Sequence, residues 1–138
     1  MKRLLVITVL VLISSGPGYG EWVFVERTNT ANMTAYADMS TVQRDGHLVK
    51  MWHLVDYQTA HLTKSGMVLS IKVQTEYDCA GERLRMRALT GFLGRMGNGE
   101  TVFHSADKGQ WQPVEPESVG HALWEVACKK AMMNLVNR

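Results

Sequence analysis

Cys79 and Cys128 are the only cysteines in this 138-residue chain, so the chemistry that its thiols can perform is limited to a few uses. Two thiols can bind a metal, act as nucleophiles or form a disulfide, and the redox compartment decides among these uses. Residues 1–20 start with the basic Lys2 and Arg3, continue as an apolar run and end in small residues, which is typical of a secretory signal peptide. We therefore predict an exported protein in which Cys79 and Cys128 form a disulfide.

Histidines and carboxylates, which supply acid–base catalysis and metal ligands in other proteins, stand here at no spacing that favours either use. The five histidines are His47, His53, His61, His104 and His121. They form no HExxH or H-x-H pattern and no Cys-His pairing at zinc spacing. The carboxylates are spread along the chain, so no acid and base are paired in a motif. We expect no enzyme, no catalytic residue, no metal and no cofactor; a metal site assembled only by the folded chain is the alternative.

Arginine recurs at every second position in Arg83, Arg85 and Arg87, which places three guanidinium groups on one face of a strand. Residues 69–78 alternate between polar and apolar in the same way, so the two segments predict a hairpin. Its register sets a polar partner opposite each arginine: Asp78 opposite Arg83, Glu76 opposite Arg85 and Gln74 opposite Arg87. The row is a candidate binding stripe for an acidic partner. Cross-strand charge pairing, which needs no partner, is the interpretation that we favour.

Net charge narrows the class of partner. The chain carries 15 Lys and Arg against 13 Asp and Glu, and two of the basic residues, Lys2 and Arg3, lie in the predicted signal peptide. The mature domain is then formally neutral and lacks the overall field that attracts nucleic acid or anionic membranes. We expect a protein ligand, from the cell envelope or a host matrix, no nucleic acid and, after signal cleavage, no membrane span.

The remaining pattern predicts a single α+β domain over residues 21–138, with an antiparallel sheet of about six strands. The expected strands are residues 22–25, a short run around Tyr36, 48–57, 69–78, 83–88 and a further hairpin, 92–96 with 100–104, turning at Asn98-Gly99. The polar residues 58–66 are expected to form a loop. Residues 118–136 follow Pro116, can be capped by Ser118 and carry apolar residues at helical spacing. We predict a helix there that packs on the sheet and is tied by Cys128 to the turn at Cys79.

Residues along almost the whole predicted mature region resemble a family of small exported bacterial domains. They are Trp22, Tyr36-x-Asp38, Ser40-Thr41-Val42, Arg44-Asp45-Gly46, Val49-x-x-Trp52, Asp56-Tyr57, Tyr77-Asp78-Cys79, Arg83-x-Arg85, Met96-Gly97-x-Gly99, Trp111-x-Pro113-Val114 and Trp124-x-x-x-Cys128. The family that this pattern resembles is the surface-adhesin protein E family. The resemblance implies an antiparallel sheet with a C-terminal helix and a disulfide, and a binding module without catalysis.

Two functions are compatible with the export signal and this resemblance. The first is a non-enzymatic periplasmic or secreted binding or envelope-accessory domain of unknown ligand. The alternative, which the resemblance implies through the namesake of the family, is a surface adhesin for host matrix or plasma proteins such as laminin and vitronectin. A cell-surface location belongs to this second function.

Overall fold

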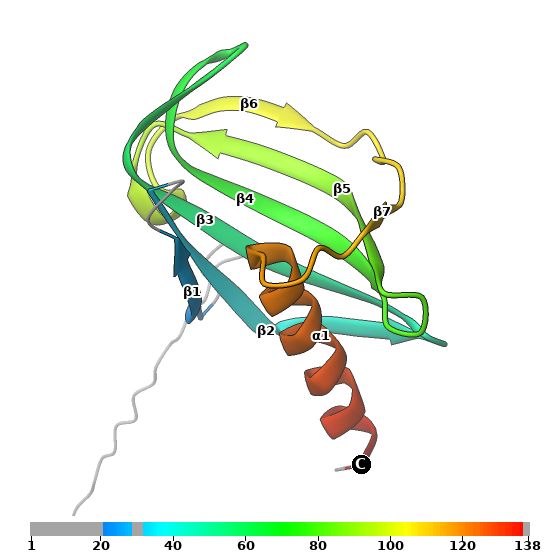
Figure 1. Cartoon of the computed structure of the whole chain (residues 1–138). Helices are drawn as coiled ribbons and strands as arrows, with labels where there is room; N and C mark the ends of the chain where they lie inside the picture. The colour runs from blue at the N-terminus through cyan, green and yellow to red at the C-terminus, as the bar shows by residue number, and fades with distance from the viewer. Residues whose placement is uncertain (1–20, 29–31, 137–138) are drawn as a thin grey trace, which may run out of the picture.

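The computed structural model describes residues 21–28 and 32–136, which form an antiparallel sheet and a long C-terminal helix (Figure 1). The predicted signal peptide, residues 1–20, lies outside the described residues. In chain order the elements are β1 (Val23–Thr28), β2 (Met33–Asp45), β3 (Leu48–Thr63), β4 (Gly66–Asp78), β5 (Arg83–Phe92), the short 3₁₀ helix η1 (Arg95–Gly97), β6 (Thr101–Ser105), β7 (Gln112–Pro113) and α1 (Val119–Val136). The predicted α+β fold, with a C-terminal helix on an antiparallel sheet, is confirmed.

The sheet is a meander in which β1 to β6 follow one another in space as they do in sequence, and β7 pairs with β5. Helix α1 lies against the face of β1 to β4 (Figure 1). The core between the two layers consists of Ala37, Val49, Met51 and Tyr77 from the sheet and Leu123, Ala127 and Ala131 from the helix. Because successive side chains of a strand point to opposite faces, the charged residues of β3 and β4 all lie on the other side of the sheet, called here the outer face.

The hairpin of β4 and β5 has the predicted register over most of its length. The pairs are Asp78 with Arg83, Tyr77 with Leu84, Glu76 with Arg85 and Thr75 with Met86. The prediction that Gln74 lies opposite Arg87 is wrong, because the register shifts after Thr75 and Gln74 pairs with Ala88. A bulge adds one residue to β5 at this point, which alternation of polar and apolar residues does not reveal.

The prediction of a loop over residues 58–66 is also wrong. Strand β3 continues to Thr63, β4 begins at Gly66, and Leu62 pairs with Met67. Residues 58–62 are exposed on both faces of this arm. Their polar composition therefore reflects a strand that extends beyond the core, where no apolar face is required.

The hairpin predicted to turn at Asn98-Gly99 has a different connection. Strand β5 ends at Phe92, which pairs with Thr101 of β6, and residues 93–100 with η1 join the two strands. Within this connection the Leu93 amide donates to the Glu100 carbonyl at 2.9 Å. Gly99 has φ +85°. The left-handed conformation that favours glycine is thus used in a compact loop of several residues instead of a two-residue turn.

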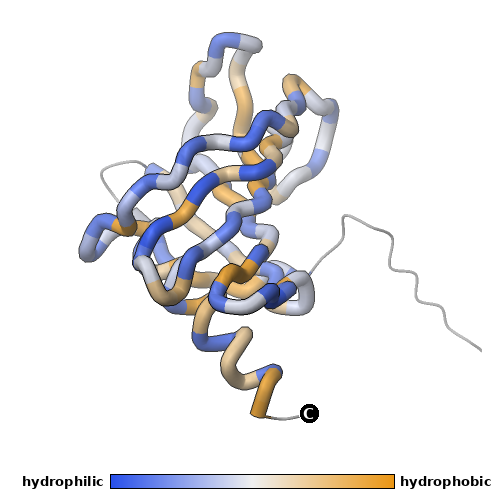
Figure 2. The backbone as a smooth tube through the Cα atoms, turned by 90° about the vertical axis from the view of Figure 1, so that its right-hand side faces the viewer, coloured by the Kyte–Doolittle hydropathy of each residue, from blue (hydrophilic) through white to orange (hydrophobic). Residues whose placement is uncertain are grey.

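Helix α1 begins and ends close to the predicted positions. The Ser118 hydroxyl accepts a hydrogen bond from the His121 amide at 3.0 Å and caps the first turn. The predicted disulfide is confirmed, and it joins Cys128 on α1 to Cys79 at the turn after β4. Beyond this disulfide the helix continues past the sheet, and its last turn is largely apolar (Figure 2).

Candidate binding surface

The arginine row lies on the outer face, where carboxylates of β4 pair with all of its members. Arg83 Nε donates to Asp78 Oδ2 at 2.9 Å, and Arg85 Nε donates to Glu76 Oε1 at 2.8 Å. Arg87 Nη1 donates to the same Glu76 oxygen at 3.2 Å. The cross-strand charge pairing favoured from the sequence is therefore present at this row. Its use as a binding stripe stays a prediction.

A tryptophan that the sequence did not single out for this surface covers two of the arginines. The indole of Trp111 lies 4.5 Å from the guanidinium carbon of Arg83 and 4.4 Å from that of Arg85. Trp111 directly precedes β7, whose Gln112 pairs with Leu84 and thereby brings the ring over β5. Stacking of a guanidinium on an indole is favourable and holds the arginine side chain in place. An aromatic residue in the otherwise polar segment 104–113 was the available sequence signal.

The carboxylates under the arginines are nearly buried, and their electrostatics follow from this position. Burial opposes ionisation of Glu76, but the hydrogen bonds and charges of Arg85 and Arg87 outweigh it and lower the pKa of Glu76. Burial likewise opposes ionisation of Asp78, whose pKa is lowered by the hydrogen bonds from Arg83 and the Gly81 amide. Both carboxylates are therefore charged at neutral pH. Removing Arg83 or Arg85 would leave a nearly buried anion without its closest cation.

The outer face has a pocket of about 310 Å³ beside Arg87. A pocket of this size is too small for a large ligand but can hold one side chain. Its lining comes from the β2–β3 hairpin and from β4 and β5: Gln43, Arg44, Asp45, Leu48, Lys50, Glu76 and Arg87. Lys50 lies opposite Glu76 in the β3–β4 ladder. Four cations, counting Arg85, thus surround two carboxylates at this place. The positive excess favours an acidic side chain of a ligand.

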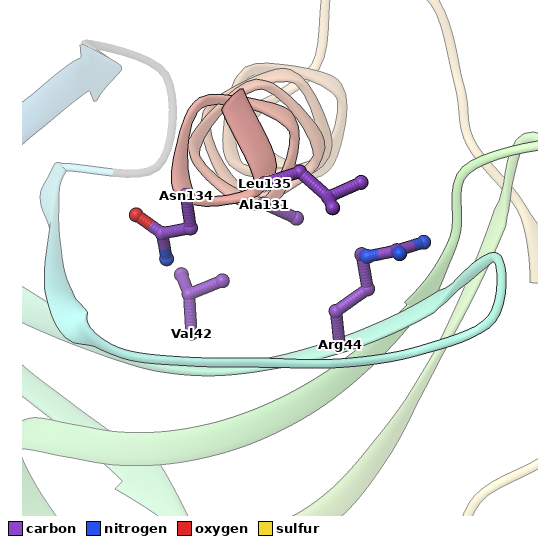
Figure 3. A pocket seen from close by; sticks show the side chains of 5 residues that line it. All are labelled: Val42, Arg44, Ala131, Asn134 and Leu135. Atoms are coloured by element: carbon purple, nitrogen blue, oxygen red, sulfur yellow. The ribbon is translucent and has the colours of Figure 1, made fainter. Parts of the chain in front are cut away.

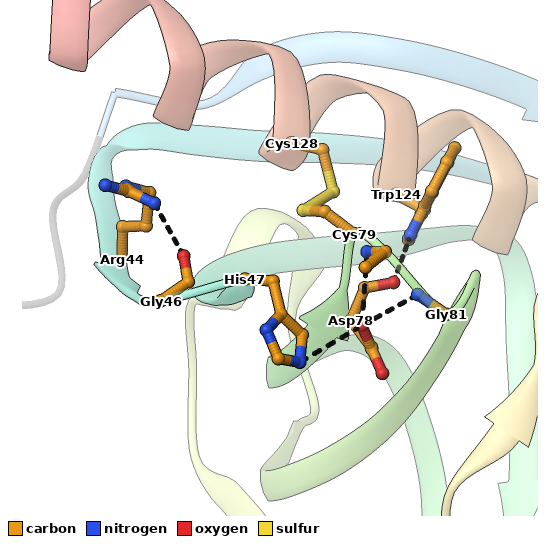
Figure 4. Close-up of a disulfide and its surroundings, with 9 residues drawn as sticks. Arg44, Gly46, His47, Asp78, Cys79, Gly81, Trp124 and Cys128 are labelled. Carbon is orange, nitrogen blue, oxygen red and sulfur yellow. Dashed lines mark hydrogen bonds and ion pairs between the residues drawn. A yellow bond between two sulfur atoms is a disulfide. The ribbon is translucent and has the colours of Figure 1, made fainter.

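Asp78 also organises the end of the sheet where the disulfide lies (Figure 4). Its Oδ1 accepts a hydrogen bond from the Gly81 amide at 2.8 Å and lies 3.9 Å from His47 Nε2. Its backbone carbonyl accepts a hydrogen bond from Trp124 Nε1 at 3.0 Å. The neighbouring residue is Cys79 of the disulfide. Asp78 therefore connects the β4–β5 turn, the β2–β3 turn and α1, which gives it a structural role.

The loop between β5 and β6 is held on the outer face by a separate set of contacts. Ser70 Oγ donates to the Gly94 carbonyl at 2.6 Å and accepts from the Gly97 amide at 2.8 Å. Arg95 donates to the carbonyls of Tyr57 and Gln58, each at 2.7 Å. The loop is thus held on β4 through Ser70 and on β3 through Arg95.

One histidine stands out by its burial. His53 on β3 is 8% exposed, and its Nδ1 has no hydrogen-bond partner among the described residues. Because burial disfavours the charged imidazolium, the pKa of His53 is lowered from 6.5 to about 4. His53 is therefore neutral at physiological pH.

The other histidines and the carboxylates do not gather into a metal site in the part of the chain that the structure describes. Over residues 21–28 and 32–136, no three His, Cys, Asp or Glu side chains are grouped so that they could hold an ion. His61 stacks on Tyr57 with 4.5 Å between ring centroids, and His104 Nδ1 lies 2.9 Å from the Thr90 hydroxyl. In the same residues, no helix has the length and apolar character that a membrane crossing requires.

Comparison with known proteins identifies the family. The sequence pattern of the family described as surface-adhesin protein E matches residues 22–129. The chain belongs to the surface-adhesin protein E family. The match covers the sheet, the disulfide and most of α1, so the family resemblance seen in the sequence is confirmed. A search among curated proteins finds no match.

Solved structures of protein E from Haemophilus influenzae have the same fold. One crystal form of Haemophilus influenzae protein E superposes with a TM-score of 0.58 at 14% sequence identity, over 86% of this chain and 97% of that chain. A second structure of Haemophilus influenzae protein E superposes with a TM-score of 0.57 at 13% identity, over 84% of this chain and 91% of that chain. At such low identity the likeness shows the fold of the surface-adhesin protein E family in this chain.

Proposed function

We propose that this chain is an exported, non-enzymatic binding domain that takes a protein ligand on the outer face of its sheet. Membership of the surface-adhesin protein E family supports a binding role and an exported or surface location. The observation that carries the proposal is the group of four cations around two carboxylates beside the pocket of about 310 Å³. An acidic segment of a protein partner is the chemistry that this excess of positive charge selects.

The members of this surface have different roles. Arg83 and Arg85 are already occupied by nearly buried carboxylates and by the indole of Trp111. Lys50 and Arg87 line the pocket, and Arg87 shares its carboxylate oxygen with Arg85. A ligand carboxylate therefore gains most from Lys50 and Arg87. Leu48, which also lines the pocket, supplies apolar contact area.

The location of the native protein is the first test. Intact cells are treated with protease or antibody, and an osmotic-shock fraction is analysed in parallel. Release only by osmotic shock supports a periplasmic binding or envelope-accessory domain. Accessibility on intact cells supports the surface adhesin. Retention in the cytoplasmic fraction with an intact N-terminus would contradict export and the whole proposal.

Family membership also favours the second function, adhesion to host matrix or plasma proteins such as laminin and vitronectin. The assay measures binding of the purified protein to immobilised laminin and vitronectin at low and high salt. A double variant, Lys50→Gln with Arg87→Gln, removes two cations while Glu76 keeps Arg85. Unfolding stability should fall by no more than about 3 kcal/mol, because the nearly buried Glu76 loses one charged hydrogen bond and keeps the shorter one from Arg85.

The expected result is binding that falls about tenfold in the double variant and loses its salt dependence. Lys64→Gln, in the exposed turn between β3 and β4, is the matched control because it removes a cation away from the pocket. Equal loss in both variants would show a general charge effect. Unchanged binding in the double variant would show that adhesion, if present, uses another surface.

A further inference from the structure

The last two turns of α1 are apolar on two opposite sides. One side carries Ala127 and Ala131, which are buried against the sheet. The other side carries Met132, Met133 and Val136, called here the outer stripe, with exposed fractions of 61%, 49% and 78%. A surface helix ordinarily has one apolar side, which packs on the core, and a polar side, which faces water. The outer stripe is therefore an apolar surface that the described part of the chain leaves uncovered.

The charge around the outer stripe is positive. Lys129 precedes Met132, Met133 and Val136 by three, four and seven residues, so it lies on the same side of the helix. Lys130 follows it on the flank. Glu125, one turn before Lys129 on the same side, is the last acidic residue before Val136. The end of the helix is thus locally basic, although the predicted mature domain is neutral as a whole.

A small hollow lies beneath the same end of the helix. Its volume is about 250 Å³, and it is lined by Val42 and Arg44 of β2 and by Ala131, Asn134 and Leu135 of α1 (Figure 3). Arg44 and Asn134 bring polar groups to the hollow from opposite elements (Figure 3). Arg44 Nη1 donates to the Gly46 carbonyl at 2.6 Å. Ala131 places this hollow on the sheet-facing side of α1, so it lies away from the outer stripe and is not part of that surface.

We propose that this end of α1 docks on an anionic phospholipid surface. The outer stripe enters the boundary between headgroups and acyl chains, and Lys129 and Lys130 contact lipid phosphates. Long lysine side chains beside an apolar stripe can reach the phosphates while the stripe enters the membrane interface. The proposal is independent of the protein-binding function of the outer face.

The shape and charge of the helix end favour a lipid surface over other occupants. The outer stripe lines neither of the two hollows described above, whereas a peptide or a small molecule binds in a concave site. The helix end also extends past the sheet, where a flat surface can reach it (Figure 1). An anionic interface neutralises Lys129 and Lys130.

The test uses the purified exported protein and lipid vesicles. Co-sedimentation is measured with vesicles of phosphatidylcholine alone and with vesicles that also contain phosphatidylglycerol, at low and high salt. The wild type should bind only the anionic vesicles, and salt should weaken the binding. Lys129→Gln with Lys130→Gln should lower the partition coefficient by about fivefold for each charge removed.

A triple variant, Met132→Gln with Met133→Gln and Val136→Gln, tests the outer stripe. It should fold, because all three side chains are exposed in a helix, and it should lose on the order of 100-fold in vesicle binding. Leu62→Gln with Met67→Gln is the matched control, since this pair is 71% and 47% exposed on the β3–β4 arm. The control should bind vesicles like the wild type.

Three results would overturn the proposal. The first is a wild type that does not sediment with anionic vesicles. The second is a triple variant that binds as well as the wild type, or a control that loses binding equally. The third is a concentration-dependent dimer in analytical ultracentrifugation that the triple variant abolishes while vesicle binding is unaffected, because the outer stripe would then be covered by a second copy.

Discussion

Lowering the pH from 7 to 5 should destabilise the fold through His53. The buried imidazole has a pKa of about 4 in the folded chain, against 6.5 for the ordinary group. Between these two values the unfolded chain binds a proton that the folded chain does not bind. The free energy of unfolding therefore falls as the pH falls through this window, and the stability is fully present above pH 6.5.

The size of the effect follows from the two pKa values of His53. At pH 5 the imidazole is almost fully protonated in the unfolded chain and about one-tenth protonated in the folded chain, which removes about 2 kcal/mol. The loss reaches about 3 kcal/mol at pH 4. Glu76 and Asp78 have lowered pKa values, so their contribution is lost only at still lower pH. Between pH 6.5 and 5, the change in stability from groups with shifted pKa values therefore comes from His53.

Urea unfolding at a series of pH values measures this dependence. His53→Gln removes the titrating group, so its free energy of unfolding should change little between pH 7 and 5. His61→Gln on the same strand is the control, because it removes an exposed imidazole and leaves His53 in place. The same slope in His53→Gln and the wild type would refute the reasoning, as would a wild type whose stability is constant over this range.

Three further predictions concern the fold. Cys128→Ser should lower the free energy of unfolding by about 4 kcal/mol in the chain-entropy model, because the disulfide closes a loop with a sequence separation of 49; thiol titration of the unfolded wild type before and after reduction is the check. Gly91→Ala should destabilise by about 1–3 kcal/mol, because a new Cβ would meet the ring of Phe103 on the neighbouring strand; an unchanged thermal midpoint would show that the ring moves away at no cost. Ser118→Ala should cost about 1 kcal/mol by removing the cap of α1, whereas Ser118→Asp should retain most of the wild-type stability in the same urea experiment.

Local patterns predicted the parts of this fold that depend on neighbouring residues. The alternation before and after Cys79 contains both the register of the β4–β5 hairpin and its charge pairs, since each strand supplies half of every pair. The helix from Val119 was equally predictable from its spacing and its cap. Residues 58–66 were not, because polar composition is shared by loops and by strands that extend beyond a core.

The candidate binding surface was harder to predict than the fold. Arg87 was found, but its bulge position and the carboxylate that it shares with Arg85 depend on a register shift. Trp111 reaches the arginines only because the two-residue strand β7 pairs with β5. Lys50 joins them across β3 and β4. Contacts between three elements arise from tertiary packing, and no spacing within one segment encodes them.

The meander has a consequence for the order in which the chain can assemble. Every neighbouring pair from β1 to β6 is adjacent in sequence, so the sheet can grow one hairpin at a time, and such local pairing is fast. The docking of α1 joins the last segment of the chain to β1 and β2, which were made first. Until α1 docks, the apolar side of a finished sheet faces water and can bind other chains. Oxidation of Cys79 and Cys128 then holds α1 on the sheet, so formation of this disulfide should reduce aggregation during folding.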